Sequence, residues 1–235
     1  CRLFNEVGLS ARTNVRCETP RGIVEVDVFA MDERSVDKIS YVVECKHWRS
    51  TIPQHVVHAF TAVMHEVGAN IGFIVSRRRL QSGAEKYTNS TNIEGLTYRA
   101  LQDRYFEAWW HNYYGRVVAK AAENACFYSE PFNITRDNAL AKIGQPEQER
   151  FRTLQMRYCA FAMLMWHHDL GTLAPDFKRE TPSSIGDHKA FLTKILWGDH
   201  AFEASCWRDL MNECVAMLKD IENQFIELFG KDLFG

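Results

Sequence analysis

The sequence lacks any long apolar run and any excess of one charge. Its longest apolar stretch, from Cys159 to Trp166, is far shorter than the roughly 20 residues that a membrane-spanning helix needs. The 28 Lys and Arg residues against 30 Asp and Glu residues give a formal net charge of −2 at pH 7. Any contact with a polyanion must therefore come from a local basic patch.

Several familiar motifs are also missing. The seven cysteines are irregularly spaced, form no C-x-x-C pair and lie mostly in apolar stretches, which is typical of reduced thiols in a cytosolic protein. There is no H-E-x-x-H, no P-loop and no G-x-G-x-x-G, so nothing indicates a helix-borne zinc site or ATP-driven movement. No secretory signal is visible, and we expect a cytoplasmic location.

The two halves of the chain differ in character. At 235 residues, 46% of them hydrophobic, the chain can bury a sizeable core. In the first hundred residues, β-rich runs alternate with helical patterns, which predicts a mixed sheet with helices in the order β-β-α-β-α-β. From residue 101 the pattern is helical with an aromatic bias. We therefore expect an α/β domain over residues 1–100 and an all-α helical bundle over residues 101–235.

Some elements of the first half have clear expected boundaries. Thr51 is expected to be the N-cap of a helix with Pro53 in its first turn and Gly68 at its end. The elements expected after it are a strand over 71–75, a helix over 80–90 and a short strand near 96–98.

The second half should consist of helices separated by polar breaks. A helix over 146–169 is expected to end at Gly171, before a loop over 172–186. Asp187 and Asp199 are the expected N-caps of a short helix and a long helix, and Gly230 should end the long one.

The last helix carries a regular apolar pattern. Its apolar residues are spaced alternately by four and three, as in helices that pack at about +20°. They are Trp207, Met211, Cys214, Leu218, Ile221, Phe225 and Leu228. This seam could join two copies of the chain, or it could pack inside one chain against the stripe from Phe151 to Met165. The sequence leaves both alternatives open.

The residues that indicate chemistry lie at the ends of two β-rich runs. Side chains alternate along a strand, so Glu44 and Lys46 project from one face and Cys45 from the other. Asp27 ends an earlier run, and pairing of the two strands would bring it beside Glu44. Two carboxylates can hold Mg²⁺, which polarises a phosphate and generates hydroxide, while Lys46 orients water or stabilises negative charge. By itself a Glu-x-Lys pair is more often a simple ion pair, so the context decides.

That context resembles a known family. The stretch from Val24 to Tyr98, with EVDVFA, YVVECKHW, the helix after Thr51 and GANIGFIVS, is similar to the Mrr-like restriction endonucleases of the PD-(D/E)xK nuclease fold. The resemblance implies an α/β restriction-endonuclease-like domain and a Mg²⁺-dependent DNA endonuclease, with Mn²⁺ as a substitute. It places Asp27, Glu44 and Lys46 in the positions of the family's acidic residue and (D/E)-x-K pair.

Two further residues enter the expected metal site. We expect the backbone carbonyl of Cys45 to act as a metal ligand beside the two carboxylates. Many members of the fold carry another acidic residue on a helix before the first strand. Glu6 is the nearby candidate here, although it lies closer to Gly8 than the family pattern suggests.

Basic and aromatic residues near this site are candidate DNA contacts. Arg77, Arg78 and Arg79 follow the strand expected over 71–75, and ligands tend to bind at the carboxyl ends of strands in open α/β sheets. Trp48 and Arg49 come shortly after Lys46. Gln54 lies at the start of the next helix, which could face the scissile phosphate, and we take it as a further candidate catalytic residue. A solvated loop for the arginines and an edge-capping role for Trp48 are the plainer alternatives.

The leading hypothesis is an endonuclease that cuts double-stranded DNA, as a prokaryotic restriction or antiphage defence effector. We expect a homodimer or higher oligomer, regulatory partner proteins of a defence system, and a helical domain that controls assembly, docking or DNA access. The alternatives are a structure-specific repair or recombination nuclease and a scaffold that keeps the fold without turnover. An intact Asp27, Glu44 and Lys46 argues against the scaffold.

Overall fold

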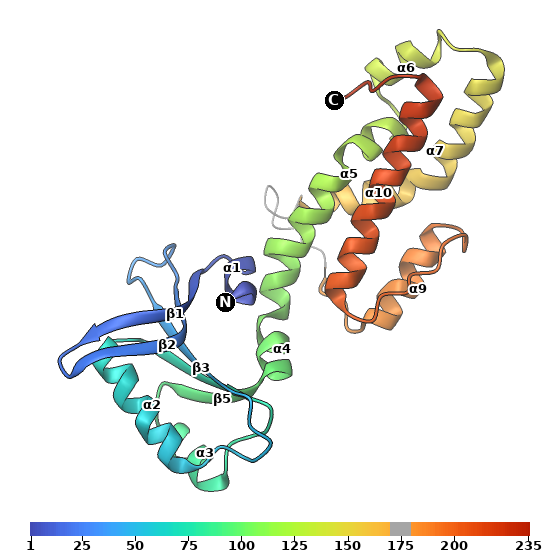
Figure 1. Ribbon diagram of the computed structural model, residues 1–235. Coiled ribbons are helices and arrows are strands. Elements are labelled where there is room, and N and C mark those ends of the chain that lie inside the picture. Colours follow the sequence, from blue (N-terminus) through green and yellow to red (C-terminus); the bar gives the residue numbers. More distant parts are fainter. Residues whose placement is uncertain (170–179) are drawn as a thin grey trace. The chain divides into compact units, whose positions relative to one another are not determined.

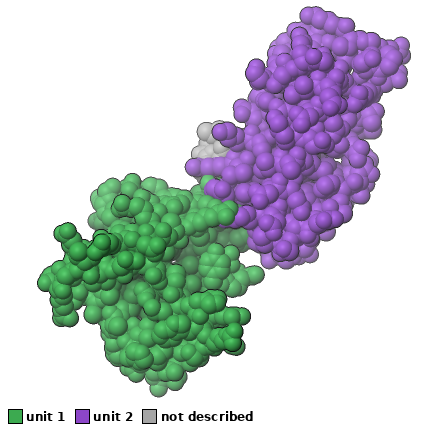
Figure 2. Space-filling view, in the orientation of Figure 1, with its two compact units in different colours: residues 1–112 green, residues 113–235 purple. Residues whose placement is uncertain are grey.

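The protein consists of two compact units. The computed structural model describes residues 1–169 and 180–235 (Figure 1). The first unit is Cys1–Asn112 and the second is Tyr113–Gly235, shown in different colours in Figure 2. The division comes later than residue 100 because helix α4 (Tyr98–Trp109) belongs to the first unit, where its Leu101 is buried.

A five-stranded mixed sheet forms the centre of the first unit. Its strand order is β1-β2-β3-β4-β5, antiparallel up to β3 and parallel from β3 to β5. The elements before α4 are α1 (Arg2–Glu6), β1 (Ser10–Thr19), β2 (Gly22–Met31), β3 (Ser40–Lys46), α2 (Gln54–Val67), β4 (Ile71–Ser76), α3 (Ser82–Thr88) and β5 (Ile93–Thr97). The predicted order is confirmed from β2 onward. The prediction missed α1 and β1.

Helices cover both faces of the sheet (Figure 1). On one face α2 approaches β4 closely, since a Cβ added at Gly72 would lie 2.7 Å from Met64 Sδ and 2.8 Å from Phe60 Cε1. On the other face the Phe4 ring of α1 stacks with Phe73, with 6.3 Å between the ring centroids. The sheet is therefore a central layer, and its residues alternate between two buried environments.

The boundaries of α2 differ in part from those expected. Thr51 is not its N-cap: the helix begins at Gln54 and Pro53 occupies the cap position. Ile52 explains the delay, because it is fully buried and pairs with Leu80 in a parallel bridge that keeps the chain extended. Gly68 ends the helix in the left-handed conformation, with φ of 69°, as predicted.

The last strand of the sheet is also shorter than expected at its end. Tyr98 is not part of β5, because the side chain of Thr97 accepts a hydrogen bond from the backbone N–H of Ala100 at 3.1 Å and so starts α4.

The described part of the second unit is helical. One turn of π-helix, Trp110–Tyr114, leads from α4 into α5. The remaining elements are α5 (Gly115–Ser129), α6 (Ile134–Leu140), α7 (Gln145–Trp166) with a 3₁₀ turn at His167–Asp169, α9 (Ile185–Ile195) and α10 (Trp207–Phe229). Gly171 and the first part of the expected loop 172–186 lie outside the described residues. Over residues 1–169 and 180–235 no helix has the length and apolar character needed to cross a bilayer.

The apolar seam of α10 lies inside the second unit. The rings of Phe225 and Tyr128 of α5 stack with centroids 5.4 Å apart, and Phe151 of α7 approaches Phe225 at 5.7 Å. The six seam residues from Met211 to Leu228 are all buried. The structure thus favours the intramolecular alternative, with α5 as a second partner that the sequence did not suggest.

Neither expected aspartate caps its helix. In α9 the N-cap is Ser184, whose Oγ accepts a hydrogen bond from the backbone N–H of Asp187 at 3.1 Å and donates one to its carboxylate at 2.7 Å. Asp187 therefore belongs to the first turn of α9, where a carboxylate interacts favourably with the positive end of the helix dipole. Asp199 instead forms an ion pair with Arg157 at 3.3 Å, and α10 begins after Cys206.

The expected end of the last helix is confirmed. Gly230 follows Phe229 in the left-handed conformation with φ of 67°.

Candidate active site

Asp27 and Glu44 lie where β2 and β3 separate. The antiparallel ladder ends at the pair Val28 and Val43, so Asp27 and Glu44 are the next residues beyond it on the two strands. Beyond the ladder, the Oδ2 atom of Asp27 accepts a hydrogen bond from the backbone N–H of Cys45 at 2.6 Å. A carboxylate therefore takes the place of a strand carbonyl, which fixes the orientation of Asp27 beside β3.

Glu44 and Lys46 share the face of the sheet that α2 covers. In the parallel ladder Glu44 pairs with Ile74 and Lys46 with Ser76, in register with Gly72, where α2 packs. The Oε1 atom of Glu44 forms an ion pair with Nζ of Lys46, and each side chain is 24% exposed. The structure thus brings Asp27, Glu44 and Lys46 to one end of the sheet, as the alternation along β3 predicted.

The donor set suits a hard cation. Within the described residues, Oδ1 of Asp27 and Oε2 of Glu44 have no hydrogen-bond partner. Mg²⁺ commonly takes one or two carboxylates and completes its shell with water and substrate phosphate. The described residues contain no group of three or more His, Cys, Asp and Glu side chains that could hold a metal ion. Any ion bound here would therefore depend on these two carboxylates, the Cys45 carbonyl, water and substrate.

The thiol of Cys45 is a poor candidate for a metal ligand. Although the residue is exposed as a whole, partial burial raises the pKa of the Cys45 thiol, and the carboxylate of Asp27 raises it further. At neutral pH the thiol stays protonated, whereas metal ions are bound by the thiolate. The backbone carbonyl is thus the atom of Cys45 that remains suited to a ligand role.

The aromatic residue after Lys46 lies close to the same site. The Nζ atom of Lys46 is 5.8 Å from the centre of the Trp48 ring, a cation–π distance. Trp48 is 40% exposed, so it does not simply seal the edge of the sheet. Its side chain is partly open to solvent beside Lys46.

Arginines from two segments gather near this end of the sheet. Arg49, Arg77 and Arg78 line one cavity of about 200 Å³, which we call the arginine pocket. Arg79 is exposed and does not line it. Because Lys46 is paired with Ser76, the segments after β3 and β4 leave the sheet at the same edge.

Two of the sequence candidates are engaged elsewhere. Gln54 is exposed, and its Oε1 atom would lie 3.1 Å from a Cβ added at Gly83, so its side chain rests against α3. Glu6 is only 7% exposed in its side chain and accepts hydrogen bonds from Arg2 at 3.0 Å and from Trp109 Nε1 at 2.9 Å. The carboxylate of Glu6 thus joins α1 to α4.

Ser76 is a polar residue at this edge that the sequence pattern did not single out. This residue is buried, stands beside Lys46 in the ladder, and donates a hydrogen bond from Oγ to the carbonyl of Arg78. Its signal in the sequence was its position, as the last strand residue before three arginines. A polar side chain there shapes the loop that carries them.

One comparison with known proteins bears on the first unit. Residues 1–105 match the family model of the Mrr catalytic domain, described as a restriction endonuclease. The first unit therefore matches the Mrr-like restriction endonuclease family. The match ends within α4, so residues 113–235 lie outside it.

Other comparisons add no functional argument for the Mrr-like domain. A search of solved structures returned a "Crystal Structure of Protein of Unknown Function AF1548", 14% identical, over 95% of this chain and 94% of that chain, with a TM-score of 0.39. A likeness at that level supports no inference. No curated protein matches.

Proposed function

We propose that this protein is a Mg²⁺-dependent endonuclease that hydrolyses phosphodiester bonds of double-stranded DNA. The observation that carries the proposal is the arrangement at the end of β3. The carboxylate of Asp27 accepts a hydrogen bond from the N–H of Cys45, the residue after Glu44, and the ammonium of Lys46 contacts Glu44. The match of residues 1–105 to a restriction endonuclease family supports the same chemistry.

Each residue of the site has a distinct role in this proposal. A bound Mg²⁺ would polarise the scissile phosphate and lower the pKa of a water molecule. Asp27, oriented by the N–H of Cys45, and Glu44 supply the carboxylate oxygens that hold the ion. Lys46 donates a hydrogen bond to the attacking water or to a phosphate oxygen, which places positive charge where negative charge develops. Its ion pair with Glu44 keeps the ammonium at this position.

The surroundings of the site support DNA as the substrate. Arg49, Arg77 and Arg78 add positive charge at the same edge of the sheet, and Trp48 offers an accessible ring for a sugar or base. The family description as a restriction endonuclease supports a role in prokaryotic restriction or defence. Cutting both strands of a duplex requires two active sites, or two successive cleavage events by one active site. Because the α10 seam is buried, a dimer would need another surface.

The test is a cleavage assay with the full chain on three substrates. Supercoiled plasmid, a four-way junction and RNA are each incubated with Mg²⁺, with Mn²⁺ and without metal. We expect plasmid to be nicked or linearised only with metal. Preferential cutting of the junction would favour a repair nuclease. Failure to cut any DNA with either metal, by a folded protein, would contradict the proposal.

A further inference from the structure

The arginine pocket is concave and is lined by cations from two separate segments. Arg49 comes from the segment after β3, and Arg77 and Arg78 come from the segment after β4. The cavity they line measures about 200 Å³, which is large enough for a compact anion and small for a folded partner. The three arginines thus border one hollow rather than a flat surface.

Backbone contacts fix the shape of the loop that carries two of these arginines. The hydroxyl of Ser76 donates to the carbonyl of Arg78. The N–H of Ile52 donates to the carbonyl of Arg79 at 3.3 Å, and the N–H of Gln81 donates to the carbonyl of Ile52 at 3.0 Å. Ile52 is fully buried, so these contacts tie the loop to the core of the unit. The backbone of the loop that carries Arg77 and Arg78 is therefore held in place without a ligand.

The positive charge of the pocket is not balanced by the protein. Within the described residues, Arg49, Arg77 and Arg78 have no carboxylate partner, and all three are exposed. The three arginines therefore carry positive charge beside one cavity without a protein anion as partner in the described structure. Guanidinium donors form a planar fork that matches the oxygens of a phosphate in bidentate geometry. A phosphate group is thus the ligand that fits both the charge and the shape.

We propose that the arginine pocket binds one phosphate group of the nucleic acid substrate and so anchors the strand relative to the carboxylate pair. The proposal rests on the proposed nuclease function, because it assigns a subsite of the same enzyme. The phosphate can be a terminal monoester or a single backbone diester of the strand. In both cases the pocket contributes a discrete contact that Arg79, one residue along the same loop, does not supply.

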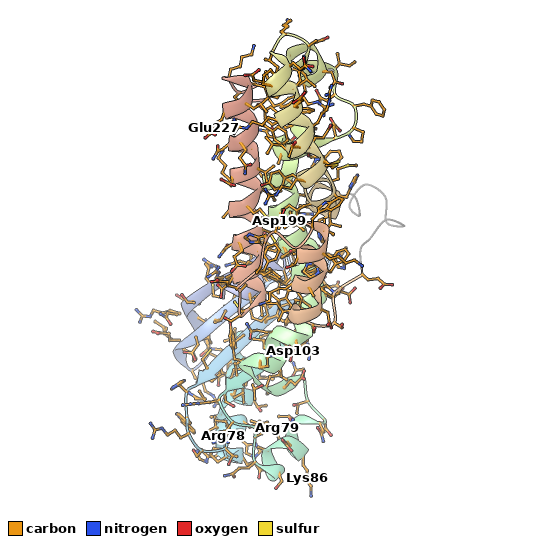
Figure 3. All side chains as sticks on the ribbon, turned by 90° about the vertical axis from the view of Figure 1, so that its right-hand side faces the viewer. Arg78, Arg79, Lys86, Asp103, Asp199 and Glu227 are labelled. Carbon is orange, nitrogen blue, oxygen red and sulfur yellow. The ribbon has the colours of Figure 1, made fainter. Side chains whose placement is uncertain are left out.

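The first test measures anion binding without DNA or metal. The full chain is titrated calorimetrically with inorganic pyrophosphate, using the wild type and the variants Arg49→Ala, Arg78→Ala and Arg79→Ala. Arg78 and Arg79 are both labelled in Figure 3. We expect the wild type to bind, and the dissociation constant to rise at least tenfold in Arg49→Ala and Arg78→Ala but less than threefold in Arg79→Ala. No binding by the wild type, or equal effects in Arg78→Ala and Arg79→Ala, would overturn the proposal.

The second test identifies the source of the phosphate. Metal-free binding is measured with duplexes that carry a 5′-phosphate, a 3′-phosphate or only hydroxyl ends. A preference of tenfold or more for one phosphorylated end that Arg78→Ala abolishes assigns a terminal monoester. Equal affinities, with a larger loss in Arg78→Ala than in Arg79→Ala, assign a backbone diester. Equal affinities with equal losses in the two variants refute the pocket.

These measurements separate the two proposals. Neither titration needs cleavage. Pyrophosphate binding by a protein that cuts no DNA would therefore refute the nuclease function, while the proposal of a phosphate-binding pocket would stand. Conversely, metal-dependent cleavage by a protein that binds no phosphate would refute the phosphate-binding pocket, while the nuclease function would stand.

Discussion

The two units use the same side chain in opposite ways. Arg78 in the first unit is exposed, lines a cavity and has no carboxylate partner among the described residues. Arg136 in the second unit is 1% exposed, donates to the carbonyl of Tyr128 at 3.2 Å and forms an ion pair with Asp137 at 2.6 Å. A buried charge must be fully partnered, whereas an exposed one remains available for a ligand. The proposed binding role therefore belongs to Arg78, and Arg136 has a structural role.

Carboxylates show the same contrast. Glu44 contacts a lysine and keeps one oxygen without a protein partner in the described structure. Glu222 of α10 is buried, and its two oxygens accept hydrogen bonds from Asn124 at 2.8 Å and from Lys219 at 3.2 Å. The first carboxylate fits the proposed role of a metal ligand, and the second joins α10 to α5. The second unit should therefore respond to mutation through its stability, and the end of β3 through its chemistry.

Truncation of the aromatic core should give the largest effect on the second unit. Phe225 is fully buried between Tyr128 and Phe151, so Phe225→Ala should lower the free energy of unfolding of that unit by about 3–5 kcal/mol. Urea unfolding followed by near-ultraviolet circular dichroism measures this decrease. The matched variant Phe132→Ala, at an 89% exposed position, should change it little. Equal decreases in both variants would contradict the assignment of the seam to the interior.

Removal of either site carboxylate should abolish chemistry without unfolding the protein. Asp27→Ala and Glu44→Ala should lose Mg²⁺ binding and cleavage together, with a rate loss on the order of 10²-fold or more. Calorimetric titration with Mg²⁺ and a plasmid assay measure the two properties. The comparison variant Glu85→Ala removes an exposed carboxylate from α3 and should retain both. Undiminished plasmid cleavage by Glu44→Ala would contradict the assignment of Glu44 to the active site.

A smaller effect is expected where α2 packs on the sheet. Gly72→Ala would force a Cβ to within 2.8 Å of Phe60 and Met64, so it should destabilise the first unit by about 1–3 kcal/mol. In α9 of the second unit, a Cβ at Gly186 would meet its nearest atom at 3.8 Å, and Gly186→Ala should be neutral or stabilising by up to about 1 kcal/mol. Thermal unfolding of the two variants compares them. A stabilising Gly72→Ala would mean that α2 is packed less tightly than described.

The smallest expected effect concerns salt dependence. Replacing Arg77, Arg78 and Arg79 together by Ala should flatten the slope of log affinity against log salt by about 0.9 for each DNA phosphate that the loop no longer neutralises. Fluorescence anisotropy at several salt concentrations measures the slope, and sequence preference should hardly change. The triple variant Arg150→Ala, Arg152→Ala and Arg157→Ala on α7 removes equal charge from the second unit. If both triple variants reduced the slope equally, the basic loop would have no special role.

The carboxylate pair and the sheet around it were predictable because local rules govern them. Alternation along β3 places Glu44 and Lys46 on one face, and the apolar run of β4 identifies a buried strand. Strand β1 was missed because most of its residues are exposed and its sequence, SARTNVRCET, has little apolar alternation. It forms by pairing with β2, a contact that no local pattern records.

The errors at helix starts have a similar cause. Thr51, Asp187 and Asp199 all have good capping side chains, yet tertiary contacts decide which residue begins the helix. Because Ile52 is buried, the chain stays extended past Thr51 and α2 begins later. In α9 the hydroxyl of Ser184 accepts the capping hydrogen bond from the N–H of Asp187. The seam of α10 was recognised from its spacing, but spacing alone cannot say whether a helix packs against its own chain. The arginine pocket is formed by segments that are far apart in the sequence, so it could be recognised only from the structure.

The most direct test of the account is Mg²⁺-dependent plasmid cleavage by Lys46→Ala. The matched control is Lys86→Ala, an exposed lysine of α3 that is labelled in Figure 3. With equal protein and saturating Mg²⁺, the wild type and Lys86→Ala should cut at the same rate, and Lys46→Ala should be slower by on the order of 10²-fold while still binding Mg²⁺. Undiminished cleavage by Lys46→Ala would contradict the claim that the end of β3 is the active site.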